Sequence, residues 1–169
     1  MIRQAIAGAA PAEVSETTVM TVWPSNAAHP IGALLGKLYS IKAGYGVVTL
    51  GNLIALASIP VALVIFFLRL APFIGARYRL TNRRVIVERG LTWKEEKSVA
   101  LDRFDSIDID IKPGQAWYDA GDLVFKHGEV ETFRLAGVSR PHAFQATCVK
   151  SQMAFTGIQK AVAHDLVSA

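Results

Sequence analysis

The chain has 169 residues, of which 51% are hydrophobic and 19% are charged, with 18 Lys and Arg against 14 Asp and Glu, a net charge of +4 and a mean hydropathy of +0.31. The length fits one domain of ordinary size with a small additional segment and excludes two large domains. The high hydrophobic and low charged fractions exclude a mainly disordered chain and indicate a membrane segment. The positive charge suggests an anionic neighbour, and the single cysteine, Cys148, excludes a disulfide framework and a cysteine-built zinc site within one chain.

The N-terminal segment, residues 1–42, has no apolar core long enough for a signal peptide. Residues 17–23 predict a short extended stretch that Pro24 ends. Apolar residues then recur at helical spacing, with Lys37 off their stripe: Ile31, Leu34, Leu35, Leu38 and Ile41. This pattern predicts either a short helix that lies in a membrane interface or the first turns of a membrane helix.

The next segment, residues 43–70, contains the most hydrophobic part of the chain, because residues 43–68 carry no charge. A spanning helix needs about 20 apolar residues, so the sequence predicts a transmembrane helix here. Pro60 lies near its middle and should kink it. The alternative is a re-entrant hairpin of residues 44–59 and 60–74, with both ends on one side of the bilayer; the single crossing is the favoured interpretation.

The orientation of this predicted anchor follows from the cations beside it. Two lysines precede it, Lys37 and Lys42, and five arginines follow it: Arg69, Arg77, Arg79, Arg83 and Arg84. The positive-inside bias therefore places the C-terminal part in the cytoplasm and the chain in the cytoplasmic (inner) membrane.

After the hydrophobic segment the sequence changes to short alternating stretches, typical of strands separated by turns. The predicted strands lie within residues 76–80, 84–89, 91–101, 104–111, 121–128 and 129–135. Pro141 then falls in the first turn of a helix that Ser139 can cap, and no further Gly or Pro occurs before Gly157. Residues 75–155 thus predict an α+β domain, a small antiparallel barrel or sandwich closed by a C-terminal helix, with residues 156–169 as the helix end or tail.

Four stretches, 77–90, 98–109, 120–128 and 137–144, carry a family resemblance. A tyrosine, leucine, threonine, asparagine and basic pattern that ends in glycine is filled by Tyr78, Leu80, Thr81, Asn82, Arg83, Arg84 and Gly90, and is followed by Gly121, Pro141 and Phe144. The chain resembles the membrane-anchored bacterial pleckstrin-homology-like family over about residues 75–150. The resemblance implies a barrel of pleckstrin-homology type behind a membrane anchor. Many members show two clear membrane helices, whereas the first hydrophobic stretch here is short and carries Lys37.

Residues that could perform chemistry do not converge in the sequence. The histidines are scattered, and residues 108–114 lack the oxygen ligands of a calcium loop, since Lys112 and Ala120 occupy two required positions. Asp119 and Asp122 flank Gly121 and are interpreted as turn residues rather than an acid–base pair. We therefore expect no enzyme activity, no catalytic or metal-binding residue and no cofactor.

The sequence feature that does indicate a function is a basic cluster. Residues 69–104 contain nine cations and four anions. We expect a lipid-facing patch made of Arg77, Arg79, Arg83, Arg84, Arg89 and Lys94. The alternative is a topology signal on an ordinary solvated strand face. Nucleic acid is not expected as a partner, because the basic strands lack interleaved exposed aromatic residues other than Trp93.

The sequence therefore predicts a membrane-anchored, non-catalytic scaffold that presents its domain to an anionic lipid or to a membrane or cytoplasmic protein. One alternative is an accessory subunit of a larger membrane complex. An alternative of another class is an enzyme whose site the sequence does not reveal.

Overall fold

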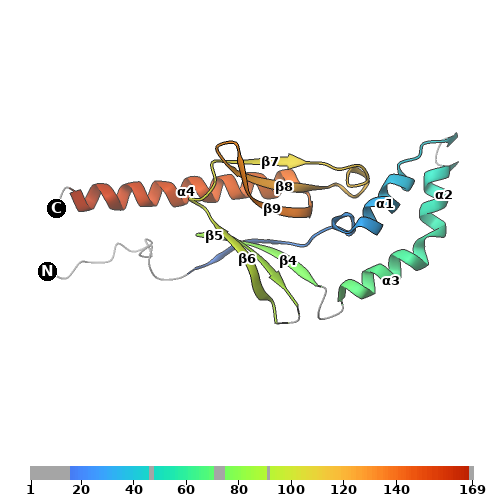
Figure 1. The fold of residues 1–169 in the computed structure, drawn as a ribbon, viewed down its shortest axis with the longest axis horizontal. Helices are drawn as coiled ribbons and strands as arrows, with labels where there is room; N and C mark the ends of the chain where they lie inside the picture. Colours follow the sequence, from blue (N-terminus) through green and yellow to red (C-terminus); the bar gives the residue numbers. More distant parts are fainter. Residues whose placement is uncertain (1–15, 46–47, 71–74, 91, 168–169) are drawn as a thin grey trace.

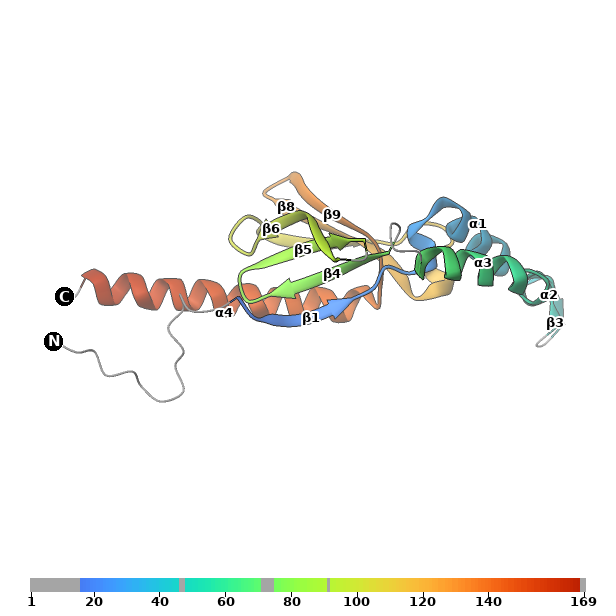
Figure 2. The same cartoon turned by 90° about the horizontal axis from the view of Figure 1, so that it is seen from below.

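The structure, a computed structural model, describes residues 16–45, 48–70, 75–90 and 92–167. Two β-sheets occupy the middle of an elongated molecule (Figures 1 and 2). A helical arm projects from one end of the sheets, and a long C-terminal helix runs beyond them at the other end.

The first sheet has four antiparallel strands in the order β1-β4-β5-β6. Its bounds are β1 (Thr18–Val22), β4 (Ala76–Thr81), β5 (Arg84–Arg89) and β6 (Lys94–Ala100). Strands β4, β5 and β6 follow one another through short turns, whereas β1 precedes the arm and pairs with β4 through Val22 and Tyr78. The arm is therefore an insertion between two neighbouring strands of one sheet.

The second sheet has three antiparallel strands in the order β7-β8-β9. Its bounds are β7 (Ser106–Asp110), β8 (Ala120–His127) and β9 (Val130–Ser139), with the 3-10 helix η2 (Ala116–Tyr118) between the first two. A bridge between Pro24 and Val138 links the chain after β1 to β9. The two sheets thus meet close to the point where the arm begins.

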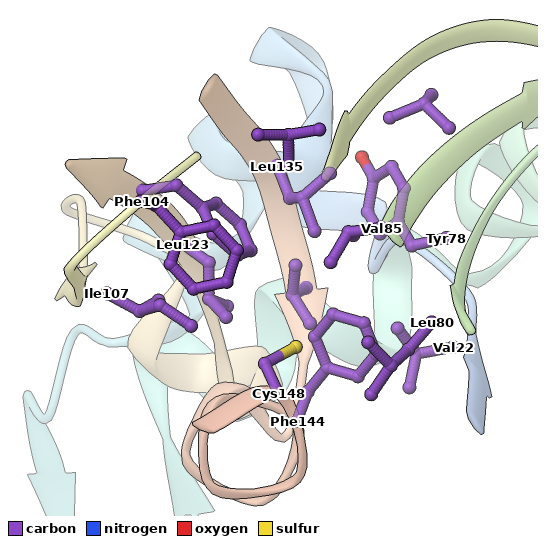
Figure 3. Close-up of a cluster of buried hydrophobic side chains, with 14 of the residues drawn as sticks. Val22, Tyr78, Leu80, Val85, Phe104, Ile107, Leu123, Leu135, Phe144 and Cys148 are labelled. Carbon is purple, nitrogen blue, oxygen red and sulfur yellow. The ribbon is translucent and has the colours of Figure 1, made fainter. Parts of the chain in front are cut away.

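The core lies between the two sheets and the helix α4 (Pro141–Val167), as Figure 3 shows. Leu80 and Val85 of the first sheet, Leu123 of the second and Phe144 of α4 are all fully buried in it. Gln152 of α4 donates from Nε2 to the carbonyl oxygens of Leu101 and Phe104 and so ties the helix to the chain between the sheets. The predicted α+β arrangement with a closing C-terminal helix is therefore confirmed.

The helix α4 does not end near Gly157 but continues to Val167. Its second half extends past the sheets (Figure 1), where Met153 and Ile158 are exposed. Glycine lowers helix propensity by about 1 kcal/mol relative to alanine but does not by itself stop a helix.

The arm consists of short elements rather than one long helix. They are η1 (Asn26–Ala28), α1 (Pro30–Tyr39), β2 (Gly44–Tyr45), β3 (Val48–Thr49), α2 (Leu50–Ala57) and α3 (Ile59–Leu70). The chain runs outward along α1, turns at the pair β2–β3 and returns to the sheets along α2 and α3 (Figure 1).

The predicted transmembrane helix over residues 43–70 is wrong. Thr49 caps the start of α2 by accepting a hydrogen bond from the amide of Asn52, and α2 ends at Ala57 with Ser58 as its C-cap. Pro60, which lacks an amide hydrogen, lies in the first turn of α3. The two helices are about 12 and 18 Å long at 1.5 Å per residue, against about 30 Å for a bilayer core. Among the described residues, no helix combines the length and the hydrophobicity needed to cross a membrane.

The structure also separates the alternatives that the sequence left open. Residues 31–41 are not the first turns of a longer helix, because α1 ends at Tyr39. The arm does return to the end of the sheets from which it starts, but its outward limb is α1 and its return limb is α2 with α3, instead of residues 44–59 and 60–74.

Candidate functional site

Helix α1 has two faces of opposite character. Gly32, Gly36 and Tyr39 are buried against the rest of the protein. The apolar stripe seen in the sequence faces away from it, so that Ile31, Leu34, Leu38 and Ile41 are exposed. In a helix of a soluble domain the apolar stripe normally faces the core. Helix α1 reverses this rule and leaves its apolar face without a protein partner among the described residues.

The return limb of the arm is apolar around most of its circumference. Leu56 has 66% of its surface exposed, and further large apolar residues of α2, α3 and the adjoining turn are exposed with it: Tyr45, Val48, Leu50, Leu53, Ile59, Val61, Leu63, Val64 and Phe67. A helix that is hydrophobic all round is ordinarily buried in a large core or in lipid. We call the exposed apolar residues of this limb and of the α1 stripe together the arm surface.

The charges on the arm are all of one sign. Residues 17–87 contain no Asp or Glu, although they include the whole arm and the strands β1 and β4. Lys37 and Lys42 are both exposed on the arm. The arm surface is thus apolar with a cationic margin, which suits an anionic neighbour.

The arm is fixed to the domain through close backbone contact. A Cβ placed on Gly36 would lie 2.1 Å from the carbonyl oxygen of Gly114 and 2.7 Å from Cε2 of Tyr118. Gly114 has φ +91, a conformation that favours glycine, and a Cβ on it would lie 1.9 Å from the carbonyl oxygen of Ala33. Only glycine at both positions allows α1 to lie on the loop between β7 and η2.

Tyr39 connects the arm's two limbs to the domain. Its hydroxyl is hydrogen-bonded to that of Ser58, at the junction of α2 and α3. Its ring packs edge-to-face on Trp117 of η2 with the centroids 4.7 Å apart. The arm is therefore held in a defined position, while large apolar residues on its outer side are exposed.

The six cations predicted to form a lipid-facing patch do not lie together. Arg77, Arg89 and Lys94 lie at the end of the first sheet from which the arm projects, because Gly90 in the turn between β5 and β6 donates to the carbonyl oxygen of Gly75. Arg83 and Arg84 lie at the other end of β4 and β5, about 17–20 Å away for strands of this length.

Most of these cations are paired within the protein. Arg77 and Arg79 both form ion pairs with Glu88, which is only 3% exposed. Arg84 pairs with Glu16 at 2.8 Å and with Glu95 at 2.9 Å, and Arg89 pairs with Glu96 at 3.0 Å. The hydrogen bond from Arg84 holds the pKa of Glu16 below its usual range. The carboxylates therefore neutralise much of the charge that the sequence assigns to the patch.

The sequence did not single out an aromatic cluster at the arm end of the first sheet. The rings of Trp23 and Trp93 pack edge-to-face with centroids 5.2 Å apart, and the guanidinium of Arg77 lies 4.4 Å from the centre of the Trp93 ring. Trp93 has φ +50, which costs a non-glycine residue about 1–2 kcal/mol. The pairing of β1 with β4 brings Trp23 to Trp93, and this pairing cannot be read from the sequence alone.

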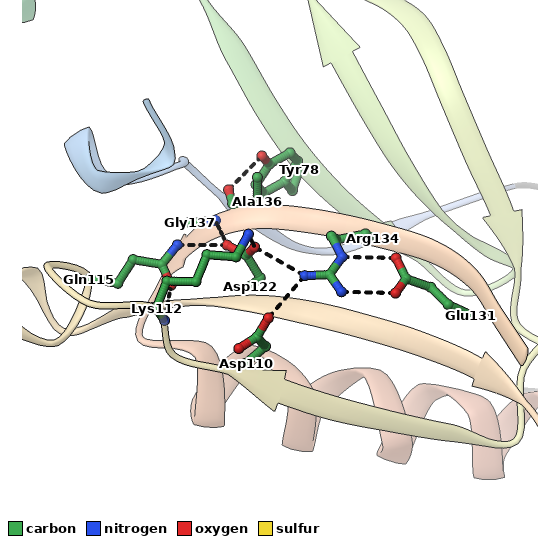
Figure 4. Close-up of polar contacts among 9 residues, drawn as sticks. All are labelled: Tyr78, Asp110, Lys112, Gln115, Asp122, Glu131, Arg134, Ala136 and Gly137. Atoms are coloured by element: carbon green, nitrogen blue, oxygen red, sulfur yellow. Dashed lines mark hydrogen bonds and ion pairs between the residues drawn. The ribbon is translucent and has the colours of Figure 1, made fainter. Parts of the chain in front are cut away.

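Asp122 is a second residue whose place the sequence did not reveal. It was expected in a turn, but it lies in β8, fully buried, at the centre of the polar network in Figure 4. Its carboxylate accepts from Lys112 at 2.6 Å, Gln115 at 2.7 Å, the amide of Gly137 at 2.8 Å and Arg134 at 3.3 Å. Burial raises the pKa of Asp122, but the hydrogen bonds from Lys112, Gly137 and Gln115 outweigh this effect and hold it below its usual range.

Asp119, the other residue of that predicted turn, does end η2 in a left-handed conformation with φ 49. A cavity of about 180 Å³ lies beside Asp122, between η1, the start of α1 and the β7–β8 loop. The surrounding protein satisfies both oxygens of Asp122, and this network holds the loop under α1 in place.

Other reactive side chains do not converge in the described part of the chain. Cys148 is buried in the core, and burial raises the pKa of its thiol to about 12. His127 pairs with Asp105 at an exposed turn, where Nδ1 lies 2.9 Å from the carboxylate. Groups of three or more His, Cys, Asp or Glu that could hold a metal ion do not occur among the described residues.

Comparison with known proteins gives one match. The bacterial PH domain family matches residues 32–153, which is more than two thirds of the chain and includes most of the arm, the strands β4 to β9 and the first half of α4. No curated protein and no solved structure matches the chain.

Proposed function

Because the chain belongs to the bacterial PH domain family, we propose that it is a non-catalytic binding module that works on a membrane surface. PH-type domains are generally non-catalytic modules that bind proteins or lipids. The family supports a binding role and leaves the partner open. The arm surface is the observation from which we choose the partner.

The arm surface supports a lipid partner because of its size and its exposure. Monomeric soluble proteins rarely expose a contiguous apolar patch of more than a few hundred Å². Tyr45 at the tip is 96% exposed, and large apolar residues on α1, α2 and α3 share this exposure. Burying a leucine side chain fully is worth about 1.5–3 kcal/mol, so a partner that covers this surface gains substantial free energy.

Two features favour lipid over a protein groove or a second copy. The apolar residues lie on both limbs and around most of the return limb, which suits a fluid solvent better than a single complementary face. In addition, the arm has no acidic residue, and Lys37 and Lys42 can keep their stems among acyl chains while their ammonium groups reach lipid phosphates.

In this proposal the arm enters one leaflet of the membrane without crossing it. The arm begins and ends at the sheets, so the whole domain stays on one side of the bilayer. The anionic cytoplasmic leaflet attracts basic segments at about 1 kcal/mol per Lys or Arg. We therefore place the protein at the cytoplasmic face of the inner membrane.

The proposal is tested by flotation of the full chain with liposomes in the absence of detergent. An arm variant, Leu34→Gln/Leu56→Gln/Leu63→Gln, replaces three exposed leucines by a residue of similar helix propensity. We expect wild type to float with liposomes and the arm variant to bind at least about tenfold more weakly, because apolar contact with lipid is lost.

The matched control is Val130→Gln/Met153→Gln/Ile158→Gln, which removes three exposed apolar side chains from the end of the molecule away from the arm. We expect this control to float like wild type. Equal flotation of the arm variant and wild type would overturn the proposal. A wild-type chain that stays unbound as a stable dimer, or that binds only vesicles with a reconstituted membrane protein, would instead assign the arm to a second copy or to a larger complex.

A further inference from the structure

All three tryptophans of the chain, Trp23, Trp93 and Trp117, lie at the arm end of the domain. Trp23 directly follows β1, Trp93 lies in the turn between β5 and β6, and Trp117 belongs to η2. These positions are far apart in the sequence. The fold nevertheless brings them to the same end of the two sheets.

The tryptophans lie beside the roots of the two limbs. Trp117 packs on Tyr39 of α1, the outward limb. Trp93 belongs to the turn whose Gly90 donates to Gly75, just before β4, where the chain has returned from α3. Trp23 packs on Trp93 from the chain that leads into η1. The arm therefore leaves the domain between two aromatic groups.

Part of this aromatic area is available to a neighbour. Trp23 is 53% exposed and Trp117 is 47% exposed. Trp93 is partly buried beneath the guanidinium of Arg77, so that a cation and an indole ring share one site. Indole rings have an apolar body with one N–H donor, and they concentrate at the depth of lipid headgroups.

We propose that these three tryptophans lie at headgroup depth when the protein is bound to a phospholipid surface, with the arm deeper in the leaflet. This inference rests on the proposed function and adds an orientation to it. The sheets then stand on the membrane by their arm end. The turn between β8 and β9 and the second half of α4 point away from the lipid (Figures 1 and 2), where they are open to a protein partner.

The test measures quenching of tryptophan fluorescence by phospholipids brominated on the acyl chain, either near the glycerol or near the terminal methyl. Three single-tryptophan forms of the full chain are made by changing the other two tryptophans to phenylalanine, which keeps the ring packing. For each form bound to vesicles, we expect a blue shift of the emission and stronger quenching by the shallow bromines than by the deep ones.

A reporter at the opposite end completes the design. In the background Trp23→Phe/Trp93→Phe/Trp117→Phe, the substitution Val130→Trp places the only indole on exposed β9, next to the β8–β9 turn. We expect no quenching of this reporter. We also expect Trp23→Ala/Trp117→Ala to weaken vesicle binding about tenfold, as loss of two interfacial rings requires.

The outcomes separate this orientation from the proposed function. If the chain floats with vesicles but the native tryptophans are not quenched, or the reporter at position 130 is quenched as strongly as they are, the orientation is overturned and membrane binding stands. If the chain does not float at all, the proposed function is overturned, and this orientation is overturned with it.

Discussion

The hydroxyl of Tyr39 is hydrogen-bonded to that of Ser58, and this contact joins the two limbs of the arm. Tyr39 is the last residue of α1, and Ser58 separates α2 from α3. Because large apolar residues on the outer faces of these helices are exposed, contacts within the arm help to hold its shape. The Tyr39–Ser58 pair is a side-chain hydrogen bond that crosses between the limbs.

Tyr39→Phe is expected to loosen the arm without unfolding the domain. The substitution removes one hydrogen bond, worth about 1 kcal/mol, and keeps the ring that packs on Trp117. Ser58→Ala should have the same effect, and the double variant should add little to either, because both remove one interaction. The loosening is measured as faster amide hydrogen exchange of α2 in detergent or on vesicles. If the effects of the two single variants added in the double variant, the pair would not act as a unit.

Gly36→Ala is expected to displace the arm from the domain. Its Cβ would overlap the carbonyl oxygen of Gly114, a backbone atom that cannot move away alone. Overpacking of this kind costs about 1–3 kcal/mol. Thermal unfolding measures the loss, and fluorescence of Trp117 should change because α1 no longer rests on η2.

Gly157→Ala is the matched control for this substitution. Gly157 lies within α4, and a Cβ on it would meet nothing within 4 Å. Alanine is the better helix former there, so we expect stabilisation of about 0.5–1 kcal/mol. Equal melting temperatures for the two alanine variants would contradict the close contact between Gly36 and Gly114.

Much of the sheet domain could be predicted from local sequence, because strands and turns there follow local rules. Ile107 and Ile109 alternate with aspartates along β7, and Gly90 sits where a turn needs φ +83. The strand β1 was foreseen only as an extended stretch, since its pairing with β4 joins residues separated by the whole arm. Long-range register of this kind is not encoded in any local pattern.

The division of the arm into short helices could not be predicted from composition, for a related reason. Composition makes residues 43–68 suitable for lipid, but a count of apolar residues does not detect where a helix stops. Thr49 as a helix cap and Pro60 in a first turn divide the run into α2 and α3. The ion pairing of the cationic patch was equally hidden from the sequence, because its partners Glu16 and Glu88 lie at opposite ends of a long acid-free stretch.

Lys37→Gln/Lys42→Gln is expected to weaken binding to anionic vesicles while leaving binding to neutral vesicles unchanged. Each lysine near an anionic surface contributes about 1 kcal/mol, so the pair accounts for roughly thirtyfold in affinity. Lys150→Gln/Lys160→Gln changes the net charge equally on exposed positions of α4. Flotation at low and high salt compares the lysine variant of the arm with the α4 control. An equal loss of vesicle binding in the control would mean that net charge, and not the arm, attracts the lipid.

Asp122→Asn is expected to destabilise the whole domain, because it removes the charge that holds Lys112 and Arg134 and puts an amide where four donors converge. Loss of a buried charged partner costs about 3–5 kcal/mol, and the exposure of Lys112 brings the expected value to the lower end of that range. Asp110→Asn, which removes an exposed partner of the same Arg134, should cost less than about 1 kcal/mol. Urea unfolding at neutral pH compares the two.

The same carboxylate predicts how stability changes with pH. The folded state holds the pKa of Asp122 below its usual value of 3.8, so the folded protein keeps this group charged at a pH where the unfolded chain binds a proton. Its contribution is therefore complete above pH 3.8 and is lost as the pH falls from there through the lower folded-state pKa. In urea unfolding series between neutral and strongly acidic pH, wild type should lose stability in this window more steeply than Asp122→Asn. Parallel curves for the two proteins would show that folding does not lower the pKa of Asp122.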